Sequence, residues 1–192
     1  MGSSGSSFRS TAEAQRTRIT TAAVRVFAKT GFHATPVTDV ATAAGVSPAY
    51  VFRLFDGKIG LFVAAVENTY AQVAETMEHA GSHSSSSDPQ SRLDAMTMAY
   101  VALIEDEDLI MLQAHAQSAS SVPEIRAAVQ SGLGEVVRTV SVVSGATAEA
   151  VQRFIAYGQL CHLIVQADLT SVRSSWAESI TAGIKHSAQK TS

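Results

Sequence analysis

Two short segments with a helical pattern, joined by a glycine, constrain the fold of this 192-residue chain most strongly. The first begins at Thr35-Pro36 and the second at Ser47-Pro48. In each pair a hydroxyl residue suited to the N-cap precedes a proline suited to the first helical position. Gly45, which lies between the two segments, permits a tight turn. This arrangement predicts a helix-turn-helix, a motif whose second helix enters the major groove of DNA.

The flanking segments predict two more helices that share a core with this pair. One runs from about Thr11 to Thr30 and should end at Gly31, because glycine suits the position after a helix. Its apolar stripe consists of Ile19, Ala22, Ala23, Val26 and Phe27. The other follows Asp56 and runs to about Ala80. The residues expected on the inner side of the second, third and fourth helices are Val37, Val40, Ala41, Ala44, Val51, Phe55, Leu61, Phe62, Ala65, Val66 and Val73.

The remaining chain also has helical patterning. A polar segment, Gly81–Ser91, predicts a loop. Alanine is abundant and aromatic residues make up only 6% of the chain, a composition that favours helix over sheet. The predicted class is therefore all-α, with about nine helices. The later helices are expected near Arg92–Ile104, Asp108–Ser120, Pro123–Ser144, Ala148–Ala167 and Val172–Ser187.

Charge is distributed unevenly along the chain. Residues 1–60 carry seven Lys and Arg against three Asp and Glu, whereas residues 61–192 carry seven against fourteen. A basic segment joined to an acidic body is typical of a nucleic-acid-binding domain with a separate partner domain, although ordinary scatter gives such a split about as often. The predicted organisation is a tag-like N-terminus at 1–10, a DNA-binding domain at 11–56 and a helical regulatory and dimerisation domain at 57–192.

Several classes of protein are disfavoured by the sequence. No apolar run is long enough to span a bilayer, so we expect no membrane partner and a cytoplasmic location. The single cysteine, Cys161, excludes an internal disulfide framework and a cysteine metal cluster. Cys161-His162 is a weak candidate for a nucleophile pair, because consecutive helical residues point in different directions. Since no phosphate-binding loop or nucleophile elbow appears, we expect neither an enzyme nor a cofactor.

The segment Arg18–Phe62 resembles the DNA-binding domain of TetR-family transcriptional regulators. The resemblance rests on G-F-x-A-T at Gly31–Thr35, the helix-turn-helix, and F-x-x-F-x-x-K-x-x-L-F at Phe52–Phe62. It implies a sequence-specific transcriptional regulator, most often a ligand-responsive repressor that binds a palindromic operator as a homodimer. The chain departs from the family at Phe52 and Leu54, where the family often has polar contacts to phosphate. The alternative is therefore a helical dimeric adaptor or sensor with weak or lost DNA binding.

Residues of three helices are candidates for contact with double-stranded DNA. Arg53 suits either a guanine edge or a phosphate. Lys58 lies in the first turn of a helix, where the helix dipole disfavours a cation unless an anion docks there. Thr38 can donate its hydroxyl to a phosphate. The complete set is Thr38, Ser47, Pro48, Ala49, Tyr50, Arg53 and Lys58.

The body is expected to bind an effector and to form the dimer. By resemblance to the family, the effector would be small and mainly apolar, and the last two helices would form the interface. The stretch Val151–Leu169 is apolar around most of its circumference, which indicates burial on both sides. Core packing explains many of the same residues. The candidate effector-binding residues are Met96, Tyr100, Met111, His115, Phe154 and Tyr157.

Overall fold

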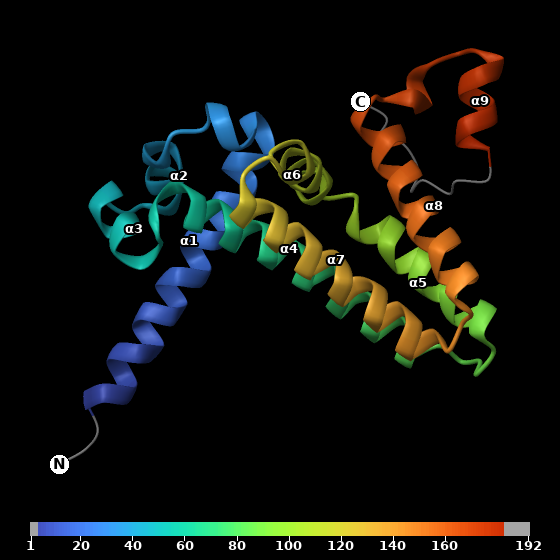
Figure 1. The fold of residues 1–192 in the computed structure, drawn as a ribbon, viewed down its shortest axis with the longest axis horizontal. Coiled ribbons are helices and arrows are strands. Elements are labelled where there is room, and N and C mark those ends of the chain that lie inside the picture. The colour runs from blue at the N-terminus through green and yellow to red at the C-terminus, as the bar shows by residue number, and fades with distance from the viewer. Residues whose placement is uncertain (1–3, 183–192) are drawn as a thin grey trace. The chain divides into compact units, whose positions relative to one another are not determined.

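The structure, a computed structural model, describes residues 4–182, with side chains from Ala12 onward. These residues form nine α-helices, one short 3₁₀ helix and no strand (Figure 1). The predicted all-α class is therefore confirmed. None of these helices is both long and apolar enough to cross a membrane. The helices are α1 Ser4–Ala34, α2 Val37–Ala44, α3 Pro48–Leu54, α4 Gly57–Ser82, α5 Pro89–Leu103, α6 Glu107–Ser118, α7 Pro123–Ser144, α8 Ala148–Gln166 and α9 Ser175–Thr181, with the 3₁₀ helix η1 at Leu169–Ser171.

The chain divides into two compact units. The first contains Met1–Thr69 and Met111–Gln130, and the second contains Tyr70–Ile110 and Ser131–Ser192. The helix-turn-helix, α1 and residues 57–69 of α4 thus belong to the first unit, and the rest of α4 belongs to the second. The functional boundary expected at residue 56 concerns the roles of the parts, and it stays a prediction.

The first unit encloses an apolar core beneath the helix-turn-helix. Helix α1 packs against α2, and α2 packs against α3. The rings of Phe27 and Phe62 meet edge to face, with their centroids 4.8 Å apart, which is a favourable aromatic geometry. The predicted stripe of the first helix is partly displaced, since Val24 and Ala28 are buried while Ala22 and Val26 are only half-buried. All eleven residues predicted to point inward from the next three helices are buried: Val37, Val40, Ala41, Ala44, Val51, Phe55, Leu61, Phe62, Ala65, Val66 and Val73.

Helix α1 has a kink at Gly31, where the sequence predicted its end, and continues to Ala34. Gly31 has φ 72° and ψ −177°, a conformation open almost only to glycine. The N-cap predicted for the next helix was wrong, because Pro36 takes that position and makes no side-chain cap. The Thr35 hydroxyl is buried and donates instead to the Gly31 carbonyl, at 2.7 Å. Thr35 therefore closes the preceding turn rather than opening α2.

The turn between α2 and α3 has the predicted chemistry. Gly45 adopts the left-handed conformation, with φ 64° and ψ 38°. The Val46 amide then donates to the Ala41 carbonyl at 3.0 Å, which satisfies one of the free carbonyls at the end of α2. The Ser47 hydroxyl accepts from the Tyr50 amide at 3.2 Å, and Pro48 occupies the first position of α3. The predicted cap and start of α3 are thus confirmed.

The second unit differs from prediction at two helix ends. Helix α5 begins at Pro89, inside the predicted loop, because the Asp88 carboxylate accepts from the Ser91 amide at 2.9 Å. Asp88-Pro89 thus starts α5 in the same way as Ser47-Pro48 starts α3. The polar composition of the segment led to the prediction of a loop there instead. At the other end, η1 precedes a short α9, so the predicted helix starts later than Val172. Residues 183–187 of that prediction lie outside the described residues.

Candidate functional site

The outer face of α3 contains most of the predicted DNA-contacting residues. Ser47, Pro48, Ala49 and Arg53 are exposed, and Tyr50 is partly exposed. These residues are exposed because Val51 and the C-cap residue Phe55 are buried and hold the opposite side of α3 against the core. The Ser47 hydroxyl caps the N-terminus of α3, so Ser47 has a structural role that does not require DNA.

Arg53 and Tyr50 form a stacked pair on this face. The guanidinium carbon of Arg53 lies 4.6 Å from the centre of the Tyr50 ring. Residues three apart are neighbours on a helix surface, so this contact follows from their spacing. An arginine held over an aromatic ring keeps its N–H groups available, because the ring occupies only its flat face. The pair therefore presents a positioned cation to anything that approaches α3.

Lys58 has an intramolecular partner that its sequence context did not indicate. Its Nζ donates to the His33 carbonyl at 3.1 Å and lies 5.1 Å from the centre of the Phe32 ring. Lys58 is half-buried and stabilises the last residues of α1, which follow its kink at Gly31. An ammonium group has three donors, so this bond and an anion contact are chemically compatible.

Arg16 anchors the other end of α3, a role that helical patterning also missed. Its guanidinium donates to the Leu54 carbonyl and lies 4.3 Å from the centre of the Phe55 ring. A carbonyl in the last turn of a helix lacks an intrahelical partner, and Arg16 supplies one. This contact spans 38 residues of sequence, so no local signal could have revealed it.

Other polar groups of the first unit also face solvent. Thr38, in the first turn of α2, is exposed. Between α1 and the end of α2 lies a hollow of about 350 Å³, with two arginines in its lining. Its lining residues are Arg18, Thr21, Ala22, Arg25, Ala43 and Ala44.

The six predicted effector-binding residues belong to both units. Met111 and His115 lie in the first unit, where a Cβ placed on Gly31 would come within 2.7 Å of the His115 ring. Met96 is fully buried in the second unit, and a Cβ placed on Gly81 would come within 2.3 Å of its Cε. Both side chains therefore fill space against a glycine, as core residues do. The other three candidates, Tyr100, Phe154 and Tyr157, are half-buried on α5 and α8.

A cleft of about 300 Å³ separates parts of α5 and α8 in the second unit. Phe154 and Tyr157 form part of its wall, together with polar side chains at its rim. Desolvation by burial raises the pKa of the Tyr157 phenol, with a smaller contribution from Cys161. The complete lining is Gln90, Leu93, Asp94, Thr97, Ala150, Arg153, Phe154 and Tyr157.

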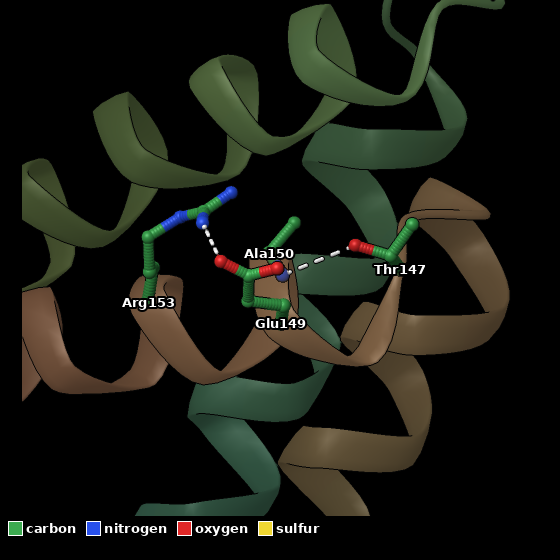
Figure 2. A network of polar contacts seen from close by, with 4 residues as sticks. All are labelled: Thr147, Glu149, Ala150 and Arg153. Atoms are coloured by element: carbon green, nitrogen blue, oxygen red, sulfur yellow. Dashed lines mark hydrogen bonds and ion pairs between the residues drawn. The ribbon is translucent and has the colours of Figure 1, made fainter.

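The first turns of α8 hold the charged rim of this cleft in place. Figure 2 shows the Thr147 hydroxyl accepting from the Ala150 amide, at 3.3 Å, and Arg153 paired with Glu149, at 2.6 Å. Both charged side chains are mainly exposed, so the pair adds little to stability. The pair instead fixes the orientation of the Arg153 side chain, because the Glu149 carboxylate holds the guanidinium beside the cleft.

Cys161 and His162 are core residues rather than a nucleophile pair. Both are buried in α8, and burial raises the pKa of the Cys161 thiol. A nucleophilic cysteine needs the opposite shift, since the thiolate is the reactive form. The His162 Nε2 is instead hydrogen-bonded to the Tyr100 hydroxyl across α5 and α8. This part-buried pair gives each group a hydrogen-bond partner beside an apolar cluster that includes Cys161.

Acid should destabilise the protein through His162. Burial lowers the pKa of His162 from 6.5 to about 4. The unfolded chain therefore binds the proton first as the pH falls, and stability is lost from about pH 6.5 down to about pH 4. The contribution of this residue over that range is on the order of 3 kcal/mol. The free energies of unfolding of the wild type and of His162→Gln, measured in urea, should converge as the pH falls through this range. A constant difference between the two would exclude His162 as the source of the acid destabilisation.

Comparison with known proteins connects the helix-turn-helix to a family. Residues 19–65 match the model of the bacterial regulatory proteins of the tetR family. This range includes α2, α3 and the start of α4, together with all seven residues predicted to contact DNA. No curated protein matches the chain.

Solved structures share the fold over most of the chain. A TetR-family transcriptional regulator from Mesorhizobium loti aligns with a TM-score of 0.65 at 20% identity, covering 89% of this chain and 96% of that one. The fatty acid degradation regulator FadR from Bacillus halodurans aligns with a TM-score of 0.68 at 17% identity, covering 90% and 97%. FadR from Bacillus subtilis, solved with stearoyl-CoA, gives 0.68 at 20% identity, covering 88% and 99%. Residues 19–65 therefore match the tetR family of bacterial regulatory proteins, and the chain shares the fold of these solved structures over most of its length.

Proposed function

We propose that this protein is a ligand-responsive repressor that binds a palindromic operator as a homodimer. The observation that carries the proposal is the solvent-facing side of α3, which bears the Tyr50–Arg53 pair within the segment that matches the family model. The basic charge of residues 1–60 favours approach to a polyanion.

In this proposal different residues contact the bases and the phosphates of the DNA. Arg53 reads a base edge, and Tyr50 orients its guanidinium. Lys58 and Thr38 contact phosphates, which sets the affinity and the register of the protein on the duplex. Lys58 keeps its bond to the His33 carbonyl in the same state, because two of its donors remain.

Dimerisation supplies the second half of the recognition surface. One recognition helix contacts too few base pairs for specific binding, so two copies on a palindrome are needed. Exposed apolar side chains on the last two helices favour them as the interface: Leu163 on α8 is 50% exposed and Trp176 on α9 is 54% exposed. Apolar groups of this size are normally covered when they form part of a contiguous surface.

The effector in this proposal is a small, mainly apolar molecule that binds the second unit. The cleft beside Phe154 and Tyr157 supports this, since it combines aromatic walls with a polar rim. The B. subtilis FadR was solved with stearoyl-CoA, so a protein of this fold can hold a ligand with a long apolar part. To release DNA, the effector must bind one conformation of the dimer more tightly than the other.

Selection from random duplexes with the full chain tests the DNA-binding part of the proposal. The selected sites should contain two inverted half-sites whose centres lie about one helical turn, or a multiple of it, apart. Enrichment of a single half-site without symmetry would contradict the dimeric arrangement. A failure to enrich any sequence would favour the adaptor alternative.

A further inference from the structure

The outer face of α3 has an apolar half to which the division of DNA contacts proposed above gives no base or phosphate. Pro48, Ala49 and Phe52 are all exposed, and Phe52 is 55% exposed. Phe52 lies four residues after Pro48 and three after Ala49, and residues at these spacings are neighbours on a helix surface, so both flank Phe52 in one patch. We call Pro48, Ala49 and Phe52 the apolar patch.

The rest of the helix separates this patch from the polar contacts. Val51 and Phe55 turn toward the core, and Arg53 stacks on Tyr50 toward the other flank. Phe52 cannot reach the core without displacing these anchors. The patch therefore faces solvent in the isolated chain, and it contains no side-chain hydrogen-bond donor or acceptor.

This chemistry limits what the patch can recognise in a major groove. Without donors or acceptors it cannot read the polar edges of bases. The apolar group that the standard base pairs present in that groove is the C5-methyl of thymine. From this match we infer that the apolar patch binds thymine methyl groups, with Phe52 as the principal contact and a specificity-determining residue.

The inference rests on the proposed function and deepens it by naming the bases read. The operator half-site should contain thymine opposite Phe52. An unmethylated cytosine there would leave the ring against a polar amino group that it cannot satisfy. Because the patch recognises the methyl group alone, 5-methylcytosine should replace thymine better than cytosine does.

Replacement of thymine by deoxyuridine isolates the methyl group, since every hydrogen-bonding atom of the base is kept. Each thymine of the selected duplex is replaced in turn, and affinity is measured by fluorescence anisotropy at constant salt. At one or two positions per half-site, wild-type protein should bind about fourfold more weakly, the effect of one lost methyl contact.

Protein variants then assign the methyl contact to Phe52. Phe52→Ala should bind the thymine and deoxyuridine duplexes equally at those positions. Ile59→Ala, which truncates another exposed apolar side chain, 36% exposed and located on α4, should keep the wild-type difference. Thermal unfolding of both variants checks that they fold, and Phe52 should tolerate alanine because its side chain lies outside the core.

The outcomes separate this inference from the proposed function. Selective binding that is indifferent to deoxyuridine at every position would overturn the inference and leave the proposed function intact. A difference that persists in Phe52→Ala would overturn the role of Phe52, because another residue would then contact the methyl group. The absence of selective binding to any duplex would overturn both.

Discussion

Gly31→Ala should destabilise the protein more than any other single alanine substitution in the turn regions of the first unit. Two independent costs combine at this position. The backbone conformation there is closed to residues with a Cβ, which costs about 1–3 kcal/mol. The added Cβ would also lie 2.7 Å from the His115 ring, and such overpacking costs about 1–3 kcal/mol more.

Gly45→Ala is the matched control for this substitution. Gly45 has a positive φ of 64°, but a Cβ there would meet no neighbour within 4 Å. It should therefore lose only the conformational term, about 1–2 kcal/mol in urea unfolding. Adding His115→Ala to Gly31→Ala should recover part of the loss, since the two residues are in contact. Equal losses for the two glycine variants, without any recovery, would contradict the proposed packing.

Arg53→Ala and Lys58→Ala should weaken DNA binding in different ways. Loss of Arg53 should relax preference at one base pair, by about 1–3 kcal/mol of discrimination. Loss of Lys58 should weaken binding to every sequence alike and lower the slope of log affinity against log salt by about one. Salt titrations on the selected duplex and a scrambled one measure both effects.

The control for Lys58 is Lys29→Ala, which removes an equal charge from an exposed position of α1. It should leave the salt slope near the wild-type value. An unchanged slope for Lys58→Ala would restrict that residue to its bond with the His33 carbonyl. If Arg53→Ala lowered the salt slope and left the sequence preference unchanged, Arg53 would contact a phosphate rather than a base.

Local patterns in the sequence predicted the helices and their inner faces well. Apolar spacing identified the buried sides of α2 to α4, and Ser47-Pro48 located the start of α3 to the residue. Such signals succeed because capping and periodicity act within a few residues. Thr35 shows the limit of the same reasoning, since a hydroxyl has two local uses and the sequence does not say which one prevails.

Contacts between distant residues account for what the sequence could not predict. Arg16 bonds to the Leu54 carbonyl, and Lys58 bonds to the His33 carbonyl over 25 residues. No local pattern indicates either contact, because the partners are backbone groups that any residue carries. Likewise, the packing of the His115 ring against Gly31 could not be predicted, and the role of His115 as an effector ligand stays a prediction.

The central claim is that α3 gives this protein sequence-specific DNA binding. The most direct test is the affinity of the full chain for its selected duplex and for a scrambled duplex at physiological salt. We predict sub-micromolar binding to the selected duplex, at least about a thousandfold tighter than binding to the scrambled one. Equal affinity for the two duplexes would contradict the claim.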